Sequence, residues 1–184
     1  MGNEKKMAHY EEAVKEFSRA IELSPDFTMP YLYRGEVYYK MGKFYLAIED
    51  YTQAIFWTNA PFAIAKGLCL RGIAYYAKGE IDKAIEDFTK ALQEEPEYAQ
   101  VYFQRGQAYL IKNEFNLAIA DCDKAIRLEP DAAGTYLVRG SAYSGIGAGE
   151  LAVIDYSKAI QLDPQIGEKL AAELNAREHE RSKL

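Results

Sequence analysis

Arginine and glycine stand side by side at four places in this 184-residue chain, and the spacing between these pairs is nearly constant. The pairs are Arg34-Gly35, Arg71-Gly72, Arg105-Gly106 and Arg139-Gly140. Successive pairs are 37, 34 and 34 residues apart, and each is followed at fixed distances by a tyrosine and two alanines. A period of this length is typical of repeat proteins, in which each unit buries its apolar face only against its neighbours.

Each period predicts a pair of antiparallel helices. Glycine and alanine recur where two helix backbones approach closely, aromatic residues recur where gaps need filling, and spacings of three and four residues put them on one helical face. A proline closes three of the units, because proline cannot continue a helix. Turn signals between the two helices occur at Met41-Gly42-Lys43, Lys78-Gly79-Glu80 and Lys112-Asn113-Glu114. The pattern also accounts for most of the 15 tyrosines as packing residues.

These coinciding positions resemble the tetratricopeptide repeat family, whose 34-residue unit carries the same aromatic, glycine, tyrosine, alanine and proline pattern. The resemblance implies an all-α, right-handed superhelical solenoid of antiparallel helix pairs. It predicts an N-terminal half repeat at 1–26, four repeats at about 27–61, 62–98, 99–132 and 133–164, and a C-terminal capping helix with a tail at 165–184. The linker between the first two repeats is expected to be three residues longer than the others.

The two ends of the array are expected to differ. The half repeat reproduces only a second helix, and the first seven residues are too short to form the missing first helix. The open edge is therefore expected to be covered either by an upstream continuation or by another chain. At the other end, Ile166, Leu170 and Leu174 recur at four-residue spacing. A solenoid needs a terminal element with one apolar and one polar side, and this segment is expected to be that cap.

An aspartate follows each repeated arginine after sixteen residues, as in Arg34 and Asp50. A catalytic pair has no reason to recur once per structural unit, so we expect a ladder of ion pairs between the two helices. Cys122 occupies an aromatic core position, which predicts a buried thiol. For Cys69, on a first helix, both a core position and a position facing the binding surface remain open.

Composition and charge exclude several classes of function. The chain has 22 basic and 28 acidic residues, so a nucleic-acid backbone is not an expected partner. It contains no apolar run long enough to span a membrane. Two cysteines and two histidines supply neither a zinc site nor a catalytic triad, and no glycine-rich phosphate loop is present. We therefore expect no enzyme activity, no cofactor and no metal.

Arrays of this kind bind ligands on the surface formed by successive first helices. The helical face opposite the core gives an apolar and aromatic strip, which favours a protein or peptide ligand. The candidate contact residues are Leu32, Tyr39, Ile73, Tyr76, Phe103, Gln107, Leu110 and Leu137. A second interpretation remains open, in which Tyr39, Tyr76 and Leu110 mainly pack against neighbouring first helices.

The family resemblance also constrains the partner. A subset of the family binds acidic C-terminal tails of heat-shock chaperones through a clamp of lysine, asparagine and arginine. The matching positions here hold Leu32, Glu36, Leu70, Gln100 and Gln104, so the clamp is absent and an apolar or mixed partner is expected. The expected function is a non-catalytic protein interaction module, and the alternative is a self-assembling scaffold that pairs through the half repeat.

The chain starts without the apolar stretch of a signal peptide, which predicts a cytoplasmic location. Ser182-Lys183-Leu184 spells a peroxisomal address and gives the alternative.

Overall fold

The computed structural model describes residues 2–168, and all regular structure in this part is helical. The helices are α1 (Gly2–Leu23), α2 (Thr28–Lys40), α3 (Phe44–Phe56), α4 (Pro61–Ala77), α5 (Ile81–Glu94), α6 (Ala99–Ile111), α7 (Phe115–Leu128), α8 (Ala133–Gly145) and α9 (Gly149–Leu162). A further helical segment begins at residue 164. Most of the predicted cap, including Leu170, Leu174 and the Ser182-Lys183-Leu184 tripeptide, lies outside the described residues.

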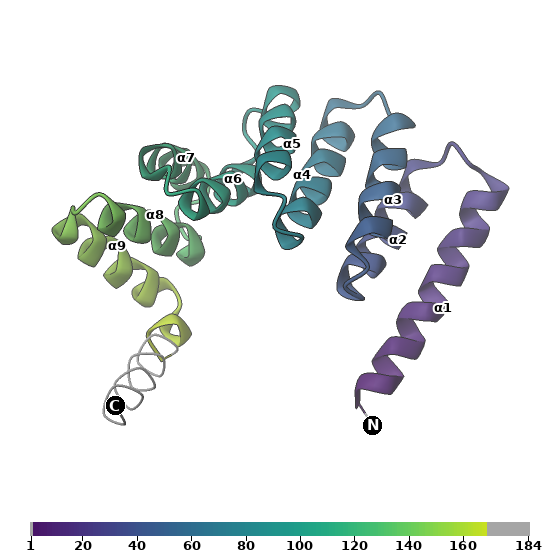
Figure 1. Ribbon diagram of the computed structural model, residues 1–184, viewed down its shortest axis with the longest axis horizontal. Helices are drawn as coiled ribbons and strands as arrows, with labels where there is room; N and C mark the ends of the chain where they lie inside the picture. The colour runs from purple at the N-terminus through teal and green to yellow at the C-terminus, as the bar shows by residue number, and fades with distance from the viewer. Residues whose placement is uncertain (1, 169–184) are drawn as a thin grey trace.

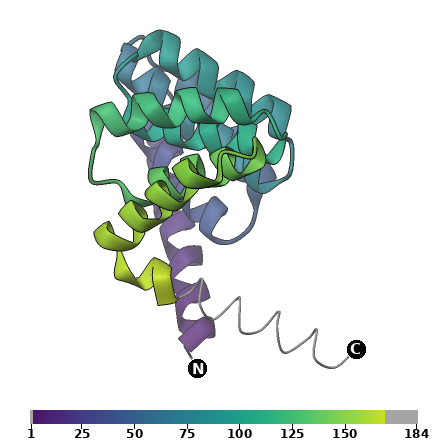
Figure 2. The same cartoon turned by 90° about the vertical axis from the view of Figure 1, so that its left-hand side faces the viewer.

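The helices follow one another in antiparallel pairs that form an arch (Figure 1). We call the pairs unit one (α2 and α3), unit two (α4 and α5), unit three (α6 and α7) and unit four (α8 and α9). The first helices of successive units touch one another, whereas within the described chain their second helices do not. The first helices therefore lie on the inner side of the curve, which we call the concave face. This arrangement confirms the expected all-α solenoid, which Figure 2 shows from the side.

Each repeated glycine lies directly against a side chain from the second helix of its unit. A Cβ atom on Gly72 would lie 2.6 Å from a ring carbon of Phe88, and one on Gly35 would lie equally close to Tyr51. Both aromatic rings are fully buried, with at most 1% of their surface exposed. The missing side chain thus makes room for the ring that fills the space between the helices.

The predicted turns between paired helices are confirmed. The residue after the helix cap has a positive φ in all four units, with glycine in three of them and Asn113, at 58°, in unit three. In unit one, Lys43 N–H donates to the Tyr38 carbonyl at 2.8 Å and Gly42 N–H donates to the Tyr39 carbonyl at 2.9 Å. This pairing satisfies carbonyls at the helix end that would otherwise lack a partner.

The closing prolines take part in a hydrogen bond that the sequence pattern does not reveal. The Tyr31 hydroxyl donates to the Pro25 carbonyl at 2.9 Å, and the same bond recurs in units three and four from Tyr102 to Pro96 and from Tyr136 to Pro130. Unit two has Leu68 at the tyrosine position and Asn59 at the proline position. The hydroxyl and the proline are therefore absent together at this junction.

The predicted ladder of ion pairs is confirmed in every unit. Each repeated arginine donates through Nε and Nη2 to the two carboxylate oxygens of its aspartate, at 2.7–2.8 Å. Three of the arginines also lie against tyrosine rings on the same helix; the Arg34 guanidinium, for example, is 5.8 Å from the centre of Tyr38. Asp155 raises the pKa of Arg139 above its ordinary value through this hydrogen bond. The aspartates of these pairs are only 3–6% exposed.

The extra residues between units one and two are in a helix, so the expected longer linker is wrong. Helix α4 has 17 residues, whereas α2, α6 and α8 have 13 each. Pro61 is the first residue of α4, a position where proline lacks no needed hydrogen bond and its fixed φ suits the helix. The added turn carries Phe62, whose ring stacks on Tyr98 with 5.9 Å between centres.

Candidate functional site

The concave face presents four positions from each first helix, and most of the predicted contact residues lie there half-buried. Ile73, Phe103, Gln107, Leu110 and Leu137 all have this intermediate exposure.

The prediction that Leu32 contacts a ligand is wrong. Leu32 is only 2% exposed and belongs to the core of unit one. The helical projection places Leu32 on the inner side, but packed side chains of α2, α3 and α4 close over it.

Tyr39, Ile73 and Tyr76 also pack against the core while retaining some exposed surface. Ile73 and Tyr76 lie against the core cluster of units two and three, and Tyr39 lies against that of unit one. The ring of Tyr39 is tilted against Phe44, with 5.4 Å between centres. Burial raises the pKa of the Tyr76 hydroxyl. These residues therefore form a part of the concave face that is held in place by packing against the core.

Both cysteines are buried free thiols. The burial of Cys122 was predicted from its core position. Cys69 is 2% exposed and packs in the core of units two and three, so its side chain does not face the concave surface. Burial raises the pKa of each thiol to about 12, so neither is poised as a nucleophile.

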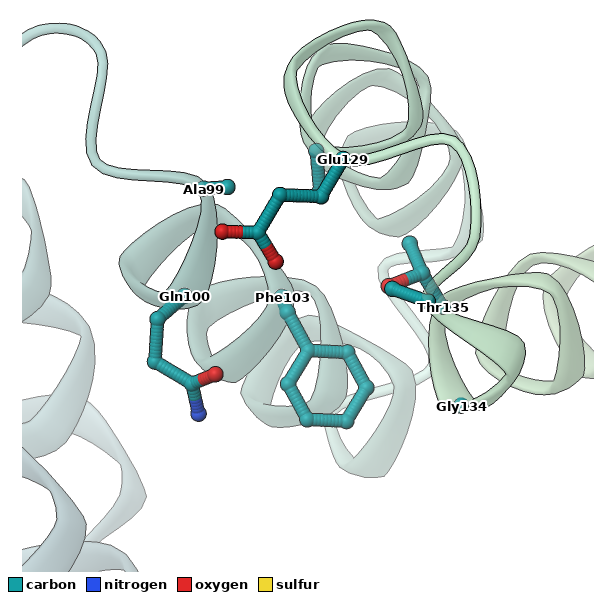
Figure 3. Close-up of a pocket in the computed structure, with 8 residues that line it drawn as sticks. Ala99, Gln100, Phe103, Glu129, Gly134 and Thr135 are labelled. Atoms are coloured by element: carbon teal, nitrogen blue, oxygen red, sulfur yellow. The ribbon is translucent and has the colours of Figure 1, made fainter.

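A hollow of about 140 Å³ lies between α6 and α8 on the concave face. Gln100 and Phe103 line it from α6, Gly134 and Thr135 line it from α8, and Glu129 lines it from the α7–α8 linker. Figure 3 shows the Glu129 side chain reaching from that linker toward Gln100 and Phe103. Of the predicted contact residues, only Phe103 lines this hollow.

The hollow has a simple origin in the repeat pattern. The position five residues before the repeated arginine holds Met29, Lys66 and Gln100 in units one to three, whereas unit four has Gly134 there. A Cβ atom on Gly134 would touch the Phe103 ring at 3.4 Å, so there is room for a side chain but none is present. The edge of the Phe103 ring is consequently left open toward the concave face.

The lining of the hollow was only partly found from the sequence. Gln100 and Gly134 appear when the helix faces are projected, but neither stands out by residue type. Glu129 and Thr135 could not be found in that way, since one lies in a linker and the other is a buried residue of α8. The useful signal was the single glycine among four equivalent positions.

Residues 2–168 lack the features of two other kinds of site. No group of three or more histidine, cysteine or acidic residues is arranged to hold a metal ion in that part. None of its helices combines the length and apolarity that crossing a membrane requires.

Family models match the chain along most of its length. Models described as tetratricopeptide repeat match residues 31–58, 65–98, 99–132 and 133–166, and one described as TPR repeat matches residues 9–42. The chain belongs to the tetratricopeptide repeat family. Proteins of this family and fold are generally non-catalytic interaction modules. No curated protein sequence matched the chain.

Solved structures of the same fold cover most of the chain. A crystal structure of MamA is 22% identical, with a TM-score of 0.76, and the match covers 90% of this chain and 95% of that one. YrrB, described as a TPR protein with an unusual peptide-binding site, is 18% identical with a TM-score of 0.71, covering 92% and 86%. The first TPR of Spaghetti (RPAP3), bound to an HSP90 peptide, is 28% identical with a TM-score of 0.54, covering 58% and 93%.

Proposed function

We propose that this protein is a non-catalytic interaction module that binds an extended or helical segment of a partner protein along its concave face. The observation that carries the proposal is the open hollow beside Phe103, which lies where first helices of adjacent units meet. A binding pocket of this type accepts one side chain of a ligand, while the surrounding half-buried wall excludes water.

The contact surface extends from the hollow along the neighbouring first helices. Tyr39, Ile73 and Tyr76 supply apolar surface toward unit one, and Gln107 and Leu110 continue from Phe103 along α6. Leu137 supplies the same kind of surface on α8. Leu32 is not part of this surface, because its side chain is buried.

Peptide binding by structural neighbours supports the general class of partner. YrrB carries a peptide-binding site, and the Spaghetti repeat domain holds an HSP90 peptide. The positions that match an acidic-tail clamp hold no lysine, asparagine or arginine here. We therefore propose an apolar or mixed segment as the ligand.

The proposal is tested with a displayed library of random peptides selected on the immobilised protein. Selected peptides should lose most of their binding to a Tyr76→Ala/Phe103→Ala double variant whose helical content and unfolding midpoint remain close to the parent. Phe56→Ala is the matched control, because this aromatic residue is 71% exposed at the end of α3. Equal binding by the folded double variant would rule out the concave face.

A second candidate function, self-assembly, is favoured by helix α1. Ala13, Phe17 and Ala20 of α1 occupy the positions that are at most 1% exposed in unit one, yet all three are only half-buried. One side of Phe17 is covered by Tyr33, whose ring lies 5.7 Å away. A second copy could cover the rest of this apolar strip. Light scattering over a wide range of protein concentrations tests this idea, and a strict monomer would refute it.

We propose a cytoplasmic location for the protein. The C-terminal Ser182-Lys183-Leu184 gives a peroxisomal location as the alternative. Fluorescence imaging of the full chain with and without Leu184 distinguishes the two.

A further inference from the structure

We propose that the hollow between α6 and α8 binds the side chain of a lysine or arginine in the partner segment. This inference rests on the proposed function and names the chemistry of one ligand position. The proposed pocket would prefer a basic side chain, whereas the clamp found in part of the family binds an acidic peptide tail.

The size of the hollow fits one side chain. Its volume is about 140 Å³, and a protein cavity of about 150 Å³ holds a single benzene-sized molecule. A guanidinium group or the end of a lysine side chain is of this order, whereas a folded segment is far too large. The hollow therefore acts as a pocket for one residue of a longer ligand.

The lining groups favour positive charge. Phe103 lines the hollow, and its ring can attract an ammonium or guanidinium group that lies over its face. The Glu129 carboxylate, the Gln100 amide oxygen and the Thr135 hydroxyl are hydrogen-bond acceptors that such a group requires. No lysine, arginine or histidine among the described residues lines the hollow. An anionic ligand group would face Glu129 without any compensating cation.

Glu129 differs from the buried acids of the ladder in its pairing. The four ladder aspartates are each saturated by an arginine. Over residues 2–168, Glu129 forms no ion pair and its side chain makes no hydrogen bond. A ligand cation would therefore add an ion pair without breaking one that the fold needs.

The same chain binds one of its own cations in this way. The Lys78 ammonium lies 3.4 Å from the centre of the Tyr45 ring and pairs with Glu80. An aromatic ring of α3 and a carboxylate of the α4–α5 turn thus hold a basic side chain between units one and two. The hollow presents the same two groups, Phe103 and Glu129, on the concave face.

A positional library of acetylated nine-residue peptides tests this proposal. In each pool one position is fixed in turn as arginine, lysine, norleucine or glutamate, and binding to the full chain is measured at low and moderate salt. Norleucine is the control, since it matches the lysine stem without the charge. We expect one position at which arginine and lysine exceed norleucine by about fivefold and glutamate is excluded. Because ion pairs are screened, this preference should shrink at higher salt.

Three variants assign the preference to the hollow. Glu129→Gln should reduce the basic preference to less than about twofold. Asp131→Asn is the matched control, because it removes one charge from the same linker without altering the lining of the hollow. Gly134→Met fills the hollow at a position that Met29 occupies in unit one, and it should abolish the preference.

The outcomes separate this inference from the function on which it rests. A basic preference that persists in Glu129→Gln, or that Asp131→Asn removes equally, would overturn the pocket assignment. Peptide binding that depends on Tyr76 and Phe103 but shows no basic preference would overturn it too, while leaving the concave face as the binding surface. A library with no binding to the parent protein would overturn both proposals.

Discussion

Arg34 donates a hydrogen bond from Nη1 to the Ser18 hydroxyl at 2.9 Å, in addition to its two bonds to Asp50. The arginine of α2 therefore joins α3 of its own unit to the preceding helix α1. The same third bond recurs at every later junction. It runs from Arg71 to Thr52, from Arg105 to Thr89 and from Arg139 to Asp123. Each arginine thus connects three helices and couples neighbouring units.

The first prediction concerns this coupling. Ser18→Ala should lower the free energy of unfolding by about 0.5–1 kcal/mol, because it removes the acceptor for Arg34. Ser157→Ala is the matched control: Ser157 occupies the same repeat position and bonds a carbonyl four residues earlier, as Ser18 does, but no arginine of the described chain reaches it. Urea denaturation measures both variants. Equal effects of the two substitutions would show that the bond between helices contributes nothing.

The second prediction concerns the ladder itself. Asp87→Ala should destabilise the fold by about 3 kcal/mol, because it leaves the Arg71 guanidinium without its partner inside the protein. Glu86→Ala, at the neighbouring residue, removes an exposed pair with Lys90 and should leave the free energy of unfolding nearly unchanged. Thermal and urea unfolding of the two variants give the comparison. A ladder without stabilising effect would make them indistinguishable.

Close helix contacts give a third prediction, which concerns two glycines at equivalent positions of the repeat. Gly72→Ala should destabilise by about 1–2 kcal/mol, since its new methyl group would lie 2.6 Å from the Phe88 ring. Gly106→Ala faces the smaller Cys122 at 3.2 Å, and the gain in helix propensity should leave stability within about 0.5 kcal/mol of the parent. Chemical denaturation measures both. The reverse order would mean that ring size does not limit the helix approach.

A fourth prediction follows from the buried thiols. Burial raises the pKa of Cys69 and Cys122 to about 12, so at about pH 8 both are fully protonated in the folded chain and react poorly with disulfide reagents. We expect no rapid thiol release with a chromogenic disulfide under native conditions and reaction of both thiols after denaturation. Rapid reaction of one thiol in the folded protein would show that its helix opens easily.

The fold could be predicted from this sequence because the same residue pattern recurs in four repeats. Arginine, glycine and aspartate recur at fixed spacing, and one spacing of sixteen residues suffices to pair Arg71 with Asp87 once antiparallel helices are assumed. The reach of Arg71 to Thr52 could not be predicted in this way. It crosses a junction where the spacing is 19 residues instead of 16, and it depends on how neighbouring units are turned relative to each other.

The candidate site was harder to predict than the fold. A helical projection separates an inner from an outer side, but it does not show that Leu32 is closed over while the equivalent Phe103 remains half-exposed. That difference depends on the size of side chains in the next unit. The hollow exists because Gly134 adds nothing beside Phe103, and Glu129 reaches it from a linker that has no helical periodicity.

The longer helix α4 shows where this architecture tolerates additional sequence. Its extra residues amount to about one helical turn and lie at its exposed beginning, so the side chains from Ala65 onward keep the orientation that their counterparts have in the other units. The start of a first helix is therefore a natural graft point. A foreign segment of one or two whole turns placed there, such as an epitope or a reporter, should leave the order of helices and the concave face unchanged.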